Sequence, residues 1–285
     1  MNFVIIILLC LLATTKVTLQ SRFGKKLLST QGDNLLFNLI FFLSAAILFS
    51  ANLPKASGYT WIFAAVFALL TVIFQLSYTT ALSSGNVSLT VMIVNLSMFL
   101  PIMASVLLYS ETLTLPRLFG ILLTFLSFLL CADTKEKQTF SAKWLLFAVT
   151  AALANGGIGI TQKIFGESAF SAEKGAFVAC SYALAFSLTL LIFTLALVKG
   201  EKAPACKTPS TYLLALLVGT VLAVFQWLNT YAISIIDGSF LFPLYSGGSI
   251  ILSSTVGMVF FKDRLTNKQK ISILIGILAV IIMNL

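Results

Sequence analysis

The stretch that decides the fold runs from Phe74 to Thr114 and reads FQLSYTTALSSGNVSLTVMIVNLSMFLPIMASVLLYSETLT. It holds two long apolar runs joined by a short polar turn, and it closes on Glu111-x-Leu113-Thr114. The same plan recurs 151 to 152 residues later, where Phe225-Gln226 repeats Phe74-Gln75 and Asp263-x-Leu265-Thr266 repeats the closing motif. Two copies of one helical hairpin predict a protein built from two related halves.

The composition excludes a water-soluble globule. Of 285 residues, 59% are hydrophobic and 9% are charged, whereas a soluble domain carries about a quarter charged residues. The apolar runs are longer and more continuous than barrel strands, so α-helices are the structures that can span lipid here. The expected fold class is therefore an all-α polytopic membrane protein.

Ten spanning helices are expected, because each crossing needs about 20 mostly apolar residues. They lie at 2–20, 34–52, 59–83, 87–109, 117–133, 142–164, 174–198, 210–235, 239–261 and 268–285. A polar linker at 134–141 separates a first five-helix repeat, 1–133, from a second, 142–285. Because five is an odd number, the second half is predicted to be inverted relative to the first, as is common in transporters.

The basic residues predict an orientation. Thirteen Lys and Arg residues fall in the loops on one side of the ten segments, and four fall on the other. The positive-inside rule then places both termini outside the cytoplasm, in a bacterial inner membrane. The net charge of +9 is spread between apolar runs, so the expected partners are lipid headgroups and not nucleic acid.

No metal, cofactor or enzymatic activity is expected. The sequence contains no His and no Cys-x-x-Cys pair, which removes the usual metal ligand and proton shuttle. No Asp or Glu lies in the middle of an expected segment. A transported solute is therefore expected to be neutral, zwitterionic or anionic and not cationic. Small residues on the helices are compatible with a monomer or a homodimer.

These motifs resemble the drug/metabolite transporter superfamily, in particular its EamA-type members. The likeness rests on the two acidic-x-Leu-Thr motifs, on Gly120 and Gly276 that follow them, and on Ala81 and Ala232 in the third helix of each half. It implies a secondary transporter, a permease or exporter, that moves a small metabolite or amino-acid-like solute by alternating access. A lipid-linked substrate flippase or a non-transporting accessory subunit stays open as the alternative.

Polar side chains at membrane depth are the candidate solute contacts, because such groups tend to face the bundle interior or a water-filled cavity. Two matching sets stand out, namely Gln75, Tyr78 and Thr79 on the third segment and Gln226, Asn229 and Tyr231 on the eighth. An amide beside an aromatic ring suits a small organic solute. For the two glutamines, interhelical hydrogen bonding worth roughly 0.5–2 kcal/mol is an equally good interpretation.

Lys16 and Lys163 match across the repeat at an offset of 147. Either they extend to the headgroups, or they form a cationic pair that binds a carboxylate or phosphate of the solute. Asn95 and Tyr245 follow the turns of the two hairpins and are further candidate contacts. Pro101, Pro243 and Gly247 are candidate hinges, because proline frees a backbone carbonyl within a helix.

Two acids are expected to be structural. Glu111 and Asp263 each stand just before a helix start, where a carboxylate favours the positive end of the helix dipole. Arg117 and Arg264 are the expected partners of these acids. The solute site itself is expected between segments one, three, four, six, eight and nine.

Overall fold

The computed structural model describes residues 2–27, 31–85, 87–131, 141–199, 209–261 and 266–283, and every regular element within these ranges is helical. The long elements are α1 (Asn2–Leu27), α2 (Gln31–Phe49), α3 (Gly58–Ser84), α4 (Val87–Leu96), α5 (Phe99–Tyr109), α6 (Leu115–Cys131), α7 (Ala142–Gly166), α8 (Lys174–Val198), α9 (Pro209–Ile233), α10 (Gly238–Phe261) and α11 (Asn267–Met283). Two short 3-10 helices, η1 (Ser50–Lys55) and η2 (Ser171–Glu173), lie between them. Most of the expected linker, up to residue 140, and Asp263-Arg264-Leu265 lie outside the described residues.

The outer faces of the helices are apolar, as expected for surfaces that contact lipid. Within the described ranges, six helical stretches are long and apolar enough to cross a membrane, and two shorter apolar helices cover Val4–Gln20 and Leu115–Leu130. Large side chains such as Leu107, Leu115 and Leu213 point outward and are 71%, 71% and 68% exposed. So much exposed apolar surface would promote aggregation in water and is favourable in a bilayer. The protein is an all-α integral membrane protein.

The fourth expected segment, 87–109, is broken into α4 and α5. The break lies at Ser97 and Met98, whose N–H groups donate to Val94 and Asn95, three residues back, at 3.1 and 3.2 Å. Pro101 explains the position, because its ring displaces the carbonyl four residues earlier, which belongs to Ser97, and it has no N–H to donate. The proline therefore ends the helical hydrogen bonding of α4 about one turn before Pro101 itself.

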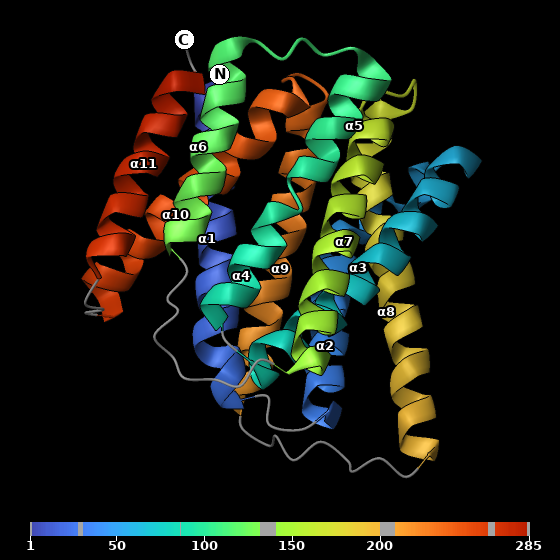
Figure 1. The fold of residues 1–285 in the computed structure, drawn as a ribbon. Helices are drawn as coiled ribbons and strands as arrows, with labels where there is room; N and C mark the ends of the chain where they lie inside the picture. Colours follow the sequence, from blue (N-terminus) through green and yellow to red (C-terminus); the bar gives the residue numbers. More distant parts are fainter. Residues whose placement is uncertain are drawn as a thin grey trace.

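The two halves pack against each other with approximate symmetry. The main contacts between a helix of one half and a helix of the other have an equivalent in which the two halves swap roles. The second helix of each half packs on its counterpart, α2 on α8, and the fifth does so as well, α6 on α11. The contact of α1 with α10 corresponds to that of α7 with α4 and α5, and the contact of α2 with α9 to that of α8 with α3. The chain is thus an inverted repeat, with α1 beginning and α11 ending at one end of the bundle, called here the terminal end (Figure 1).

The seam between the halves is close-packed. Ser127 on α6 and Ser272 on α11 each donate to the other's carbonyl, at 2.9 and 2.8 Å. Where α7 crosses α5, a Cβ on Gly159 would lie 2.9 Å from the ring of Pro101. The small residue is required there, because real Cβ contacts are longer. These contacts bring α7 and α5 together beside the centre of the bundle.

Candidate functional site

A cavity of about 110 Å³ lies between the two halves. It is lined from the first half by α1, α3, α4 and α5 and from the second by α7, α9 and α10, which are the six segments expected from the sequence. Since one water needs about 10–15 Å³ of such space, there is room for roughly seven to eleven waters or one small organic solute. One copy of the chain forms the whole cavity.

The lining positions follow the period of a helix. On α7 they are Asn155, Ile158, Gly159 and Gln162, which is the i, i+3, i+4, i+7 spacing of one helix face. Glycine at 159 lets the Pro101 ring of α5 pack against this face, and the two amides lie on either side of that contact along the helix. The sequence therefore builds one wall from a single stripe of α7.

Gln162 and Gln226 of the cavity lining belong to a buried network of hydrogen-bonded amide side chains. The Gln162 side-chain amide donates to Gln226 Oε1 at 3.0 Å and to Thr230 Oγ1 at 2.9 Å, and its oxygen accepts from Asn229 Nδ2 at 2.9 Å. Asn229 Oδ1 is left without a hydrogen-bond partner. An unpaired buried acceptor of this kind costs about 1–3 kcal/mol.

A hydrogen bond joins the two halves at the α4–α5 break. Asn155 Nδ2 on α7 donates to Ser97 Oγ at 2.7 Å, and Ser97 Oγ donates to the Val94 carbonyl at 2.6 Å. The break therefore lies in the cavity wall and is coupled to the second half.

Aromatic rings form another part of the cavity lining. Phe74 and Tyr78 on α3 stack with ring centroids 5.3 Å apart, and Phe225 on α9 meets Tyr245 on α10 edge to face at 5.7 Å. The ammonium of Lys16 lies 5.0 Å from the centroid of the Phe74 ring. The cavity thus combines apolar surface, amide groups and one cation, which is the usual make-up of a site for a small organic molecule.

Seven of the residues predicted from the sequence line this cavity. They are Lys16, Tyr78, Asn95, Pro101, Gln226, Asn229 and Tyr245. The sequence analysis missed Gln162, which is central to the amide network, and it did not favour Asn155 as a contact. Their spacing of seven residues on an otherwise apolar segment was the available signal.

The other predicted residues are not part of the cavity lining. Gln75 is fully buried on α3, and neither its amide nitrogen nor its oxygen has a partner. Thr79 donates to the Gln75 carbonyl at 2.8 Å. Tyr231 lies on α9 against Trp227, with the Lys174 ammonium 4.6 Å from its ring centroid. The hinge candidates Pro243 and Gly247 lie within α10, which continues through both.

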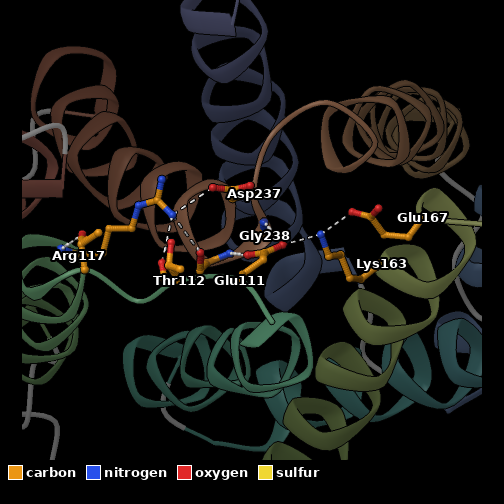
Figure 2. A network of polar contacts seen from close by, with 9 residues as sticks. Glu111, Thr112, Arg117, Lys163, Glu167, Asp237 and Gly238 are labelled. Carbon is orange, nitrogen blue, oxygen red and sulfur yellow. Dashed lines mark hydrogen bonds and ion pairs between the residues drawn. The ribbon is translucent and has the colours of Figure 1, made fainter. Parts of the chain in front are cut away.

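Lys163 is buried at the terminal end, where it closes a network between the halves (Figure 2). Its ammonium lies 2.5 Å from Glu111 Oε1 and 2.7 Å from Glu167 Oε1. The Lys163 side chain is 2% exposed, so it does not extend to the headgroups, and Glu111 is 8% exposed. Glu111 belongs to the first half and Lys163 to the second, and the pair therefore holds the halves together.

Glu111 caps a helix, but the helix belongs to the other half. Its carboxylate accepts from the N–H groups of Gly238 and Ser239, at 3.0 and 2.9 Å, at the first turn of α10. The expected pairing with Arg117 is wrong, since Arg117 binds Asp237 at 3.0 Å instead (Figure 2). Burial raises the pKa of Glu111, but the hydrogen bonds from Lys163, Ser239 and Gly238 outweigh it and hold that pKa below its ordinary value.

The threonine of each repeated motif is the residue that caps the helix following it. Thr114 Oγ1 accepts from the Arg117 N–H at 3.4 Å at the start of α6. Thr266 Oγ1 accepts from the Gln269 N–H at 3.3 Å, and Gln269 Oε1 accepts from the Thr266 N–H at 2.9 Å, which is a capping box. In the first motif the threonine therefore begins the fifth helix, and the acid is left free to bind the other half.

Glu173 makes the reciprocal contact at the same end. This second-half acid accepts from the Ser57 N–H at 2.8 Å and from Thr60 Oγ1 at 2.5 Å, at the start of α3 in the first half. Each half thus supplies one carboxylate to a helix N-terminus of the other, where the dipole favours negative charge. Among the described residues, no group of three His, Cys, Asp or Glu is placed to bind a metal.

The inverted five-helix halves around a central polar cavity define this chain as a membrane transporter. A sequence profile of the EamA-like transporter family matches it twice, over residues 4–132 and 142–285. The chain belongs to this family, which is part of the drug/metabolite transporter superfamily. A solved structure titled only "Crystal structure of protein" superposes with a TM-score of 0.76 at 15% identity, over 99% of this chain and 95% of that one, which shows the fold alone. No curated protein shows significant similarity to the sequence.

Proposed function

We propose that the protein is a secondary transporter that moves a small metabolite or amino-acid-like solute by alternating access. The cavity is its solute site. The observation that carries the proposal is that this polar cavity lies between the two halves while a buried ion-pair network joins the same halves at the terminal end. A site between inverted repeats, closed at one end, is what such a mechanism requires.

The state represented here is open away from the terminal end. The deep lining residues Gly159 and Gln162 are buried, whereas Val91, in the second turn of α4, and Lys16 are partly exposed. The cavity therefore extends from the middle of the bundle towards the side whose loops carry most of the basic residues. With the termini outside the cytoplasm, as the loop charges predict, this is an inward-facing state.

The moving parts in this proposal are the halves 1–133 and 142–285. Closing the cavity brings α4 towards α7, and the break before Pro101 allows α4 to tilt independently of α5. Pro243 and Gly247 are the corresponding candidate hinges in the second half. Hinges of this kind are a few residues at element ends that absorb the backbone change.

The test measures solute uptake by proteoliposomes that contain the Gln226→Ala variant and compares it with uptake by proteoliposomes that contain Gln75→Ala. The first variant removes a hydrogen bond from the cavity network, and a loss of about 1–3 kcal/mol corresponds to roughly a 5- to 150-fold lower uptake efficiency. The second removes an amide that lacks partners and does not line the cavity, so uptake is expected to persist. Equal uptake by Gln226→Ala and wild type would contradict the site. Lipid movement in a scrambling assay without soluble flux would contradict the function.

A further inference from the structure

Lys16 differs from the other cations that the structure describes at the seam between the halves. Among the described residues that line the cavity, it alone carries a charge. Its ammonium lies over the Phe74 ring, and within the described part of the chain no carboxylate forms an ion pair with it. The cavity therefore presents one uncompensated positive charge to whatever enters.

Lys163 shows what a buried lysine between the halves binds when it is satisfied. This residue, which matches Lys16 in sequence at an offset of 147, is held by the carboxylates of Glu111 and Glu167. The remaining described acids near the seam are also engaged, since Asp237 binds Arg117 and Glu173 binds Ser57 and Thr60. A charge in a low-dielectric site is costly unless it is paired, and the protein supplies no partner for Lys16 there.

We propose that Lys16 binds the carboxylate of the transported solute, so that the protein selects organic monocarboxylates. This inference rests on the proposed transport function and names its substrate class. A single ammonium neutralises one carboxylate. A phosphate monoester carries about −1.5 to −2 at neutral pH, and the described lining offers no second cation for it. A cationic solute would place two like charges in one small cavity.

The rest of the cavity fits the remainder of such a solute. Phe74 and Tyr78 present a stacked aromatic surface beside the ammonium, and Phe225 presents a third ring. These surfaces suit an apolar or aromatic group bonded to the carboxylate. The amide of Asn229 belongs to the buried network behind these rings, and its Oδ1 is closed to solvent. The recognised pattern is one anionic end and one apolar body.

The experiment compares three probes that share one skeleton and differ in charge. These are 3-phenylpropionate, 3-phenylpropionamide and 3-phenylpropylamine, each radiolabelled, with uptake measured in proteoliposomes. The wild type is expected to carry the acid at least about tenfold more efficiently than the amide or the amine, since a hydrogen bond to a charged group is worth about 1.5–3 kcal/mol. Lys16→Met is expected to lose about 10- to 100-fold on the acid only, and Lys16→Arg to retain the preference.

Lys174→Met is the matched control, because Lys174 also lies over an aromatic ring but does not line the cavity. It is expected to behave as wild type. The inference is overturned if wild type carries the amide or the amine as well as the acid, or if Lys16→Met keeps the acid preference. The wild-type probe series decides the question even if Lys16→Met does not fold. Flux of a fluorescent lipid with no flux of any probe or of a metabolite mixture would instead overturn the transport function.

Discussion

Replacing Lys163 with Met should open the terminal end of the bundle. The Lys163 side chain is 2% exposed, and its partner Glu111 is 8% exposed. Removing one member of a buried ion pair costs about 3–5 kcal/mol, because the other charge is left uncompensated. The methionine fills the space of the lysine stem, so packing is largely kept. Glu111 retains its bonds to α10 but loses the contact with α7.

The loss destabilises the conformation in which the terminal end is closed. It does not destabilise the open conformation, in which the ion pairs of this network are already apart. At 1.36 kcal/mol per tenfold change, the equilibrium should move towards opening by about 150- to 5,000-fold. Ser105 on α5 is a suitable reporter, because it is fully buried near this end and its Oγ lies too close to Gly238 for a Cβ to fit there. A Ser105→Cys reporter in a protein without native cysteines should be labelled by a membrane-impermeant maleimide far faster with Lys163→Met than without it.

Glu167→Gln is the graded comparison. Glu167 is 38% exposed, and exposed ion pairs contribute about 0–1 kcal/mol, so labelling should rise by at most about fivefold. Lys163→Arg keeps the charge and should stay closer to wild type than Lys163→Met. If Lys163→Met and wild type label at the same rate while both are folded, the network does not hold this end shut.

Two further predictions concern the same end. Because the pKa of Glu111 is held below its ordinary 4.5, its ionised form stabilises the fold. That contribution is complete above about pH 5 and is lost as the pH falls through the lowered value. When the pH is lowered below about 4.5, the midpoint temperature of thermal unfolding should therefore fall in wild type, and it should fall less in Glu111→Gln. A reporter fused after Leu285 should be active outside the cytoplasm, and activity inside would contradict the loop-charge orientation.

Most of the helical layout was predictable, because hydropathy alone decides which segments can lie in lipid. The break at Ser97 was not, although Pro101 was recognised as a hinge candidate. A proline acts on the carbonyl four residues earlier, so the disturbance lies one turn before it. Whether such a segment kinks or divides depends on contacts that the sequence alone does not show. Here the Ser97 carbonyl accepts from the Leu100 N–H at 3.1 Å, and Asn155 from the other half donates to the Ser97 hydroxyl.

Only part of the candidate site was predictable, because the sequence does not show how each helix is rotated about its axis. Sequence periodicity indicates which residues share a face, but not which neighbour that face meets. Gln226 and Gln75 match in the repeat, yet Gln226 lines the cavity while Gln75 is buried away from it. Gln162 escaped notice beside Lys163, although one turn separates it from Gly159 on the cavity stripe of α7.

The two matched lysines show why an inverted repeat can keep its scaffold and still diverge in charge. A lysine that closes one end must be paired, because a buried ion without a partner is strongly destabilising, and Lys163 has two carboxylates. A lysine that binds a solute must lack a permanent partner, because a resident carboxylate would compete with that solute. Lys16 meets this second requirement among the described residues. Adding a carboxylate to the lining of the same cavity, for example Asn95→Asp, should therefore weaken uptake of 3-phenylpropionate more than uptake of its amide.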